Sequence, residues 1–548
     1  MKVKIDGKTL EINEPTRVLQ LIDNSDRRYV GCTVNNRLKD LKYILQCDSE
    51  IELVDLTMYD GSRIYQSTLR YVVAMAVKNI YPKAKVTFNY SVSRSIFASV
   101  SGLGHAFTSE NLDAISKEVK RIIDADMEIE YLTMTKKEAM EYYESIGYID
   151  KVKVLKYRKQ AEVHMYKCGD YMNYMYSYML PSTGYLHTYE LKLYTPGFLI
   201  LYPRSEAGGI PAFKDERVFR EALREANVWA NTANCDSIDR VNEIIENGDA
   251  LEFINMCETR HNDQLTHLGD EIVSNVDNIK LICVAGPSSS GKTTFTNRLR
   301  IELKTRGYEP LMISMDDYYK VDLEKYPVDE DGNPDFEHIE GLDLELFDKT
   351  LFNLIQGEET LLPRFNFKNR ERTFVGPVRL RKKQPILIEG IHGLNPKIAP
   401  SISDENKFKI YIAPIGQSRI DSHTPISISD MRLIRRMVRD HYTRGFDIER
   451  TIFLWNSVRN GEFKWIYQNQ NNADFVFNSE LSYELCVMKK HIVPLLEKIG
   501  PESSAYNTAR RLIKFMKYFD DISDKWVPCN SILREFIGDS IFYTEDKI

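Results

Sequence analysis

A glycine-rich loop with the spacing of a phosphate site lies past the midpoint of the chain. Gly286-x4-Gly291-Lys292-Thr293 follows the apolar run 281–285 and precedes a helix-prone stretch. Glycines let backbone N–H groups surround a phosphate, and a helix that begins near Lys292 adds partial positive charge. Lys292 is expected to reach the β- and γ-phosphates, and the Thr293 hydroxyl to ligate Mg²⁺. The predicted nucleotide-binding residues are Gly286, Ser288, Ser289, Ser290, Gly291, Lys292, Thr293 and Thr294.

Two acidic residues end apolar runs that read as strands. Asp316 follows "LMISM", and Glu389 follows "PILI". The carboxyl ends of strands in parallel sheets are where ligands bind. Asp316 is expected to accept the proton of an attacking hydroxyl, and Glu389 to hold Mg²⁺ or its water shell. The plainer alternatives are a turn or helix-capping aspartate and a helix-capping glutamate.

A helix-prone stretch near residue 436 is rich in arginine. Four of them recur at i, i+3, i+4 and i+7, on one helical face: Arg432, Arg435, Arg436 and Arg439. Arg444 follows, near a probable helix end at Gly445. Guanidinium groups bind phosphate oxygens bidentately, so an anionic ligand would give this face a purpose. The alternative is a solvated basic face paired with Asp430 and Asp440.

The elements that must position these residues form an α/β pattern. Short apolar runs alternate with helical stretches, as in a parallel sheet covered on both faces by helices. These runs are "KLICVAG", "PLMISMD", "QPILIEG", "FKIYIAP" and "ADFVFNS". Residues 278–500 are therefore predicted to form the α/β domain that carries the loop.

The residues before and after this domain have other patterns. Residues 1–57 read as a small β-grasp unit, with strands around Gly7 and a short helix near "TRVLQLI", and 60–210 as an α+β domain. Residues 211–277 are polar and helix-prone, and 501–548 read as a C-terminal helical extension.

Composition narrows the class of protein. The 548 residues carry a formal net charge of −7, which does not indicate a nucleic-acid or membrane-surface protein. No stretch approaches the ~18 apolar residues of a membrane span, and the alternating N-terminus reads as a strand rather than a signal peptide. The eight cysteines form no CxxC pair, which predicts reduced thiols and a cytoplasmic location.

The loop, the two acids and the arginine helix, in this order, resemble the uridine kinase/phosphoribulokinase family of P-loop kinases over residues 280–480. "GPSSSGKTT" is similar to the family's nucleotide loop, "SMDDYYK" to its "DSFY" segment, "ILIEGIHGL" to its "EGI" strand end and "RLIRRMVRDHYTRG" to its lid helix. The resemblance implies ATP and Mg²⁺ as cofactors, Asp316 as catalytic base and Glu389 as a magnesium ligand. It also implies that Arg436, Arg439 and Arg444 contact the phosphates or the acceptor.

The acceptor side departs from the uridine kinase pattern. Glu337 stands where the family's "FDHPD" has its ribose-binding aspartate, and "PRFNFKNRER" replaces "P-x-Y-D-F-x-x-H-x-R" with Phe365 and Arg370 at the tyrosine and histidine. Phe446 stands where the lid ends in arginine. The implied reaction is ATP-dependent phosphorylation of a small-molecule hydroxyl, most simply the 5′-OH of uridine or another nucleoside, with Glu337, Phe365, Arg370 and Arg436 facing the acceptor. Another small polyol remains an alternative acceptor.

The first half resembles other proteins. Residues 1–57 look like a TGS domain, and 60–210 look like the second additional domain of threonyl-tRNA synthetases. Those synthetases carry two histidines and a Cys-x3-His as an editing site, and Tyr71, Met75, Cys168 and Met172 occupy those positions here. Thioether and phenol are poor substitutes for imidazole, so no editing hydrolysis is expected. The first half is left with a binding or regulatory role, toward RNA, a small effector or a second subunit. The alternative function for the whole chain is therefore an RNA-linked regulatory ATPase. A third hypothesis is an ATP-binding sensor that has lost phosphoryl-transfer activity.

Overall fold

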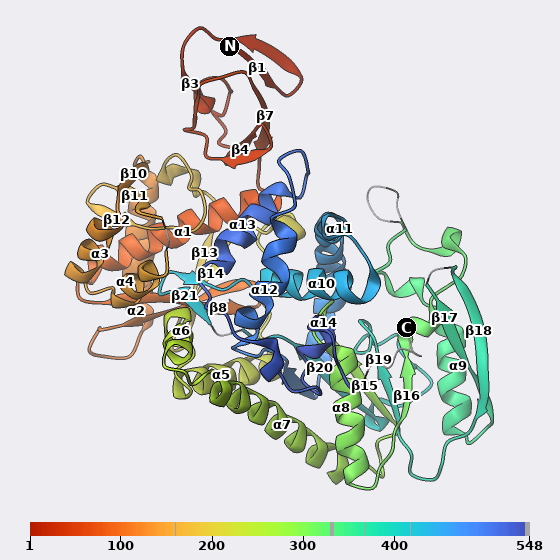
Figure 1. Ribbon diagram of the computed structural model, residues 1–548. Coiled ribbons are helices and arrows are strands. Elements are labelled where there is room, and N and C mark those ends of the chain that lie inside the picture. Colours follow the sequence, from red (N-terminus) through yellow and green to blue (C-terminus); the bar gives the residue numbers. More distant parts are fainter. Residues whose placement is uncertain (159, 329–331, 333, 368, 417, 543–548) are drawn as a thin grey trace.

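The computed structural model describes residues 1–158, 160–328, 332, 334–367, 369–416 and 418–542. Its N-terminal lobe stands apart at the top of Figure 1 and contains a sheet of order β2-β1-β7-β4-β5. The strands are β1 (Lys2–Ile5), β2 (Lys8–Glu11), β4 (Gly31–Val34), β5 (Arg37–Lys39) and β7 (Ser49–Val54). The predicted short helix is only a single 3₁₀ turn, Val18–Gln20. The reason is that β3 (Thr16–Arg17) pairs with β6 (Ile44–Leu45), which leaves too few residues for an α-helix.

The next part is built on one long buried helix. α1 (Tyr59–Ile80) contacts α2 (Ser109–Asp124) and β8, and it shares a core with the sheet β13-β14-β9-β8. The strands are β8 (Lys85–Val92), β9 (Ser95–Ser101), β13 (Glu190–Tyr194) and β14 (Gly197–Leu201). A second sheet orders β10 (Glu130–Thr135), β11 (Glu162–Cys168) and β12 (Tyr171–Asn173), beside α3 (Lys136–Ser145) and α4 (Ile149–Lys156). This mixture is the α+β architecture that the sequence predicts.

Three helices lead from this part to the phosphate loop. They are α5 (Arg217–Thr232), α6 (Ile238–Glu246) and α7 (Ala250–Ser274). α7 runs beside α8 (Lys292–Thr305), the helix that follows the loop (Figure 1). The segment is therefore helical, and its apolar side joins the core of the following sheet.

The sheet of the second half is parallel and has the order β16-β19-β15-β20-β23. Its strands are β15 (Leu281–Ala285), β16 (Leu311–Ser314), β19 (Ile386–Glu389), β20 (Lys407–Ala413) and β23 (Phe475–Asn478). All five coincide with the predicted apolar runs. Alternate residues of β15 pack into two different cores, Ile282 with the α8 side and Leu281 with the α9 (Leu344–Ile355) side. Burial on both faces explains why these strands are continuous apolar runs.

The remaining elements lie between and after the strands of this sheet in the chain. β17 (Thr360–Asn366) and β18 (Glu371–Val378) form a hairpin beside α9, and β21 (Arg419–Asp421) pairs with β22 (Thr424–Pro425). α10 (Ile428–Arg444), the predicted arginine helix, packs on α11 (Ile448–Gly461), α12 (Glu484–Leu496) and α14 (Arg534–Ile537), and α13 (Tyr506–Met516) contacts α12. The last six residues of the predicted C-terminal extension lie outside the described residues.

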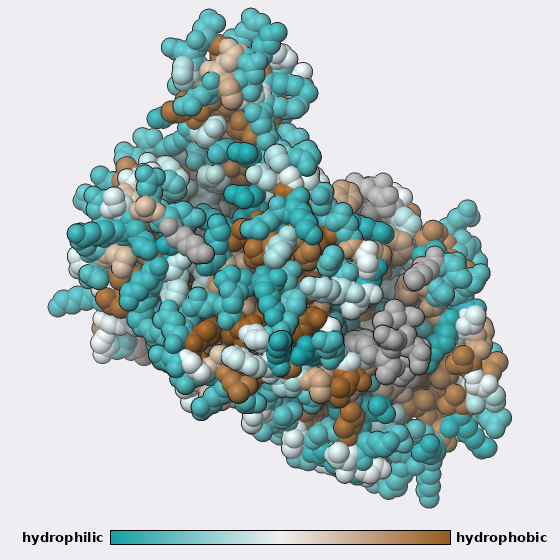
Figure 2. Space-filling view, in the orientation of Figure 1, coloured by the Kyte–Doolittle hydropathy of each residue, from teal (hydrophilic) through white to brown (hydrophobic). Residues whose placement is uncertain are grey.

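Hydrophilic and apolar residues are interspersed over the face shown in Figure 2. None of the helices among the described residues combines the length and the apolar character that crossing a membrane requires.

Candidate active site

The glycine-rich loop has the geometry of a phosphate cradle. Gly291 has φ +90° and caps α8, which begins at Lys292. A Cβ on Gly286 would lie 2.0 Å from the carbonyl oxygen of Ile412, so only glycine fits there. The Lys292 ammonium donates to the carbonyl oxygens of Gly286 (3.0 Å) and Pro287 (3.1 Å). The lysine thus folds over the loop, within reach of any phosphate that the loop holds.

Three hydroxyls of the loop are buried without a hydrogen-bond partner among the described residues. They are the side-chain oxygens of Ser289, Ser290 and Thr294. Buried hydroxyls are normally paired, and an unpaired one indicates a ligand or water position. Together with the N-terminus of α8, they favour an anion with several acceptor oxygens.

The two predicted acids lie at the same edge of the sheet as the loop. Ser314 is in register with Glu389 in the β16–β19 pair, and Val284 is in register with Glu389 in the β15–β19 pair. Burial, followed by the charge of Asp316, raises the pKa of Glu389 to about 7, and Lys292 opposes this shift. The pKa of Asp316 is also raised, by loss of water around its carboxyl, against Lys292 and Arg444. The structure therefore brings Lys292, Asp316 and Glu389 into one electrostatic cluster.

The neighbouring aspartate has a different role. Asp317 accepts hydrogen bonds from the Arg364 guanidinium (2.6 Å) and the Phe365 backbone N–H (3.1 Å). It therefore ties the 3₁₀ turn after β16 to β17. Asp316 makes no ion pair with any described residue, so its carboxylate is the one free to act on a ligand.

The arginines of α10 fall into two groups with different contacts, although the sequence places four of them on one helical face. Arg432 and Arg435 are fully buried, which excludes the solvated basic face as their explanation. Arg432 donates to the Ser288 carbonyl oxygen (2.9 Å) and pairs with Glu462. Arg435 pairs with Glu484 (2.5 Å). Arg435 also donates to the Ser289 carbonyl oxygen (3.4 Å), so both arginines hold the backbone of the phosphate loop.

The arginines predicted to contact phosphate lie farther along α10. Arg436 donates to the Ser288 side-chain oxygen (3.0 Å). Arg436, Arg439 and Arg444 all pair with Asp440, at 3.4, 2.7 and 3.7 Å. One carboxylate does not neutralise three guanidinium groups. Burial, then Arg439, lowers the pKa of Arg436, and Arg439 is the main cause of the lowered pKa of Arg444. This cationic group faces the loop and has spare charge for an anion.

The predicted acceptor residues also lie together. The Arg370 guanidinium lies 5.9 Å from the centre of the Phe365 ring. Tyr319 connects them to the acids: its ring is 6.4 Å from that of Phe365, and Asp316 and Glu337 both help to raise its pKa after burial. Burial, then Glu462, raises the pKa of Glu337 to about 7.

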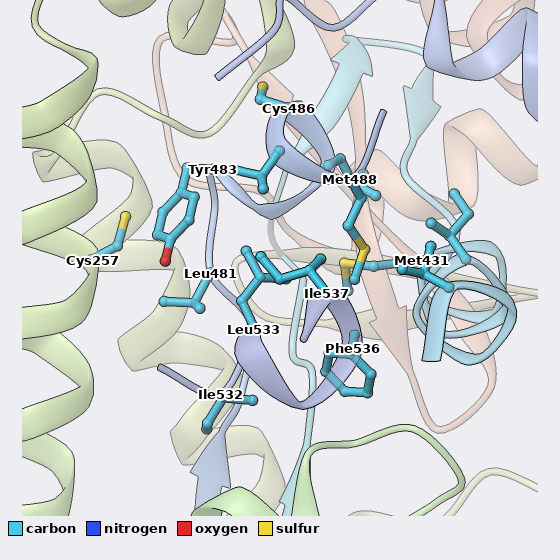
Figure 3. Close-up of a cluster of buried hydrophobic side chains, with 14 of the residues drawn as sticks. Cys257, Met431, Leu481, Tyr483, Cys486, Met488, Ile532, Leu533, Phe536 and Ile537 are labelled. Atoms are coloured by element: carbon cyan, nitrogen blue, oxygen red, sulfur yellow. The ribbon is translucent and has the colours of Figure 1, made fainter. Parts of the chain in front are cut away.

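The C-terminal segment reaches the phosphate loop, which the sequence did not indicate. Glu535 accepts the backbone N–H of Thr294 (3.0 Å), in the first turn of α8. A Cβ on Gly291 would lie 2.5 Å from Ile532, so the segment lies directly on the loop. Figure 3 shows how it is held: Ile532, Leu533, Phe536 and Ile537 lie in an apolar cluster with side chains of α7, α10 and α12. Glu535 thus places a carboxylate where a nucleotide phosphate is expected to accept an N–H.

This carboxylate predicts an effect on nucleotide affinity. Replacing Glu535 by Gln keeps the acceptor oxygen and removes a negative charge beside the loop, so Kd for ATP·Mg²⁺ should fall severalfold, about 1 kcal/mol in a partly screened site. Calorimetric titration measures it. Asp539→Asn is the matched control, because that side chain is 92% exposed in the same segment and should leave Kd unchanged. Weaker ATP binding by Glu535→Gln would show that the carboxylate stabilises the loop and does not compete with a nucleotide phosphate for it.

Three of the residues at the synthetase-like positions, Tyr71, Met75 and Cys168, are buried in one core. The Tyr71 hydroxyl donates to the carbonyl oxygens of Tyr166 (3.1 Å) and Tyr171 (2.9 Å). Cys168 is fully buried, and burial raises the pKa of its thiol to about 11. These contacts give both side chains a structural explanation.

The residues at the loop suit a magnesium ion held jointly with a nucleotide. The described residues contain no group of three His, Cys, Asp or Glu side chains that could hold a metal by themselves. Mg²⁺ is usually held by one or two carboxylates plus substrate phosphates. Glu389 and Asp316 repel each other here, and a divalent cation near Glu389 and Thr293 would relieve that repulsion.

Comparison with known proteins finds different relatives for the N-terminal region and for residues 281–483. Residues 281–483 match the model of the phosphoribulokinase/uridine kinase family. The N-terminal region is 31% identical over 168 residues to threonine–tRNA ligase of Fusobacterium nucleatum, which covers 30% of this chain and 27% of the ligase. The ligase of Methylococcus capsulatus is 28% identical over 191 residues, 34% of this chain and 30% of the ligase. The chain thus spans less than a third of the length of these relatives.

A solved structure of a possible uridine kinase from Bacillus stearothermophilus is also similar. Its TM-score is 0.28 at 20% identity, and the match covers 40% of this chain and 98% of that chain. The resemblance that the sequence predicts is confirmed: residues 281–483 match the model of the phosphoribulokinase/uridine kinase family, and they follow an N-terminal region similar to threonine–tRNA ligases.

Proposed function

We propose that the second half transfers the γ-phosphoryl group of ATP to a hydroxyl of a small molecule. The observation that supports this most is the cluster of Lys292, Asp316 and Glu389 at the mouth of the loop. The family match over residues 281–483 points to the same class of reaction. ATP and Mg²⁺ are the cofactors proposed here.

Each residue has a role that its surroundings suit. The loop N–H groups and Lys292 bind the phosphates, and Asp316 accepts the proton of the acceptor hydroxyl. Arg436, Arg439 and Arg444 stabilise charge on the transferred group, because they are several cations on one carboxylate. Mg²⁺, when bound, would offset the charge of the β- and γ-phosphates, with Thr293 and Glu389 nearest to it.

The arginines also keep water from the reaction. A kinase that admits water to the loop hydrolyses ATP instead of transferring its phosphate. α10 carries Arg436 directly over Ser288 of the loop, so it covers the region where the phosphates are expected. We propose that α10 acts as the lid of the site.

The acceptor that we propose is a nucleoside, with a sugar or other polyol as the alternative. Glu337, Phe365 and Arg370 lie beside Tyr319, next to Asp316. Their aromatic and charged groups suit a ring and its hydroxyls. A panel of nucleosides and sugars, screened with ATP for ADP release, tests this. If only sugars cause ADP release, the acceptor is not a nucleoside. If none of the small molecules causes ADP release, the proposal is wrong.

A double substitution tests the nucleoside directly. Phe365→Tyr with Arg370→His restores the two residues of the uridine kinase pattern, so kcat/KM for uridine should rise about tenfold relative to other acceptors, the value of one or two new hydrogen bonds. Because Arg370 has φ +54°, the single Arg370→Asn variant controls for backbone strain at that position. An unchanged acceptor preference would show that these positions do not read the base or ribose.

The second candidate, an RNA-linked regulatory ATPase, has one observation in its favour. The N-terminal region is similar to threonine–tRNA ligases. That function requires salt-sensitive RNA binding and ATP hydrolysis that RNA stimulates. Hydrolysis measured with and without total tRNA separates the two functions: stimulation without any phosphorylated small product supports the ATPase.

A further inference from the structure

A cavity lies between the two halves of the chain, apart from the acids of the active site. Its volume is about 290 Å³, close to the lower end of ordinary ligand pockets. It is lined by α1, the β8–β9 hairpin, the N-terminus of α10 and α13. Its lining touches the phosphate loop at Pro287 but does not include Lys292, Asp316 or Glu389, so a ligand here would be distinct from the proposed ATP and acceptor.

Positive charge dominates this arginine-lined cavity. Eight cationic side chains and three carboxylates line it. The cations are Arg63, Arg70, Arg94, Arg204, Arg432, Arg459, Arg511 and Lys514. The carboxylates are Glu206, Glu216 and Asp430, and each of them is already paired with one of these arginines. A fourth carboxylate, Glu462, pairs with Arg432 and Arg459 from outside the lining, so four carboxylates face eight cations and the protein's own acids do not neutralise the cavity.

Two arginines of α1 contribute positive charge that no described carboxylate pairs with. Neither Arg63 nor Arg70 makes an ion pair with any residue in the described ranges. Arg70 donates only to neutral acceptors, the carbonyl oxygen of His423 (2.6 Å) and the Ser67 hydroxyl (3.3 Å). Burial lowers its pKa to about 10. Burial, then the nearby Arg511, lowers the pKa of Arg63. Uncompensated like charges at a buried position cost free energy, which a bound anion would recover.

Polar atoms of the lining also lack partners. The Nε atoms of Arg70 and Arg459 and the Thr424 hydroxyl are buried without a hydrogen bond to any described residue. Each of these residues is 7% exposed. Buried polar groups are normally satisfied by protein, water or ligand. Three such groups in one cationic cavity point to a ligand with several acceptor oxygens.

The remaining lining indicates that the ligand has an organic part. Six tyrosines line the cavity: Tyr59, Tyr90, Tyr176, Tyr202, Tyr411 and Tyr467. Their rings offer apolar contact and their hydroxyls offer hydrogen bonds. We propose that this arginine-lined cavity binds a small phosphate ester, with the phosphate at Arg63 and Arg70 and the organic part against the tyrosines. Guanidinium groups bind phosphate oxygens bidentately, which suits this assignment.

The cavity connects directly to the phosphate loop. Arg432 and Arg459 line the cavity and both pair with the buried Glu462, which also accepts the backbone N–H of Ser288 (3.2 Å). A ligand that binds these arginines alters their pairing with Glu462, and therefore the contact by which Glu462 holds the loop. Its binding is therefore coupled to nucleotide binding, and the coupling is reciprocal.

Calorimetry on the full chain tests the site without relying on catalysis. AMP and ribose 5-phosphate are the phosphate-ester probes, and adenosine and inorganic phosphate are the matched probes that lack one part. A non-hydrolysable ATP analogue with Mg²⁺ is kept saturating, so that the probes do not enter the phosphate loop. Saturable binding of at least one ester, tighter than adenosine and inorganic phosphate, is expected. Binding of both esters indicates recognition of the sugar phosphate, and binding of AMP alone indicates recognition of the base as well.

Two variants locate the binding. Arg63→Gln removes an unpaired charge and should weaken ester binding about tenfold or more. Gln66→Trp fills the cavity from the next turn of α1 and should weaken binding without a change of charge. Arg224→Gln, at an exposed position of α5, is the control and should bind like wild type. The proposal is overturned if no ester binds, if inorganic phosphate binds as well as the esters, or if both folded cavity variants bind like wild type.

The coupling is measured in the same protein. The affinity for the ATP analogue should change at least twofold when the bound ester is saturating, and Arg63→Gln should abolish that change. An unchanged affinity would refute the coupling. Because the readout is binding, a negative result here leaves the proposed phosphotransfer intact, and the reverse also holds.

Discussion

Asp316→Asn is expected to lower kcat for phosphoryl transfer by about 10²–10⁴-fold, the usual contribution of a positioned general base. The amide has the same shape as the carboxylate but cannot accept the acceptor's proton. Asp316 makes no ion pair with any described residue, so the fold and ATP binding should persist. Steady-state ADP release with the best acceptor gives kcat, and circular dichroism and thermal melting check the fold.

The adjacent residue supplies the control for this prediction. Asp317→Asn loses its ion pair with Arg364, whose side chain is 54% exposed, and such pairs contribute about 1 kcal/mol or less. Its amide can still accept from the Phe365 N–H, so kcat should stay within about fivefold of wild type. If Asp316→Asn keeps near-normal turnover, or if Asp317→Asn loses more activity, then the base is misassigned.

Lys292→Ala is expected to weaken ATP binding and to lower kcat by about 10²–10³-fold, as when one preorganised donor is lost from a developing negative charge. Among the residues that the structure describes, its ammonium donates only to the loop carbonyls of Gly286 and Pro287, and it lies in the field of Asp316 and Glu389. Burial lowers its pKa, and these carboxylates oppose that shift. Calorimetry measures the affinity, and ADP release measures the rate.

Lys304→Ala is the matched control, at the opposite end of the same helix. Lys304 pairs with Glu309 at the surface, with 58% of its side chain exposed, so its loss should change neither ATP affinity nor kcat. Wild-type ATP affinity in Lys292→Ala would show that the loop does not bind the triphosphate in the proposed way.

Much of the second half was predictable because its signals are local. The five strands of the parallel sheet are buried on both faces, so each is a continuous apolar run. Asp316 and Glu389 were found because they end such runs, and parallel strands bring their carboxyl ends to one edge. The loop motif needs only its own spacing and the strand and helix on either side.

The partners of the arginines on α10 could not be predicted from local sequence patterns. Helical periodicity placed Arg432, Arg435, Arg436 and Arg439 on one face, but the partners that separate them come from distant parts of the chain. Glu462 lies 30 residues after Arg432, and Glu484 lies 49 residues after Arg435. Periodicity describes the face of a helix and not the element that packs against it.

Two further features depend wholly on tertiary contacts. Glu535 reaches Thr294 across 241 residues of sequence, and no spacing in the C-terminal segment indicates such a contact. The arginine-lined cavity draws its arginines from between residue 63 and residue 511. In the N-terminal lobe, the pairing of β3 with β6 replaced a predicted helix by a turn, which shows a tertiary contact overriding local propensity.

The central claim is that the second half moves a phosphoryl group from ATP to an organic hydroxyl. The most direct test incubates the full chain with Mg²⁺ and ATP that carries ¹⁸O in its γ-phosphate, together with the panel of nucleosides and sugars, and follows the label by mass spectrometry. The account predicts the label on one organic phosphate ester, formed in equal amount with ADP and formed about 10²–10⁴-fold more slowly by Asp316→Asn. Label found only in inorganic phosphate, with or without RNA, would contradict it.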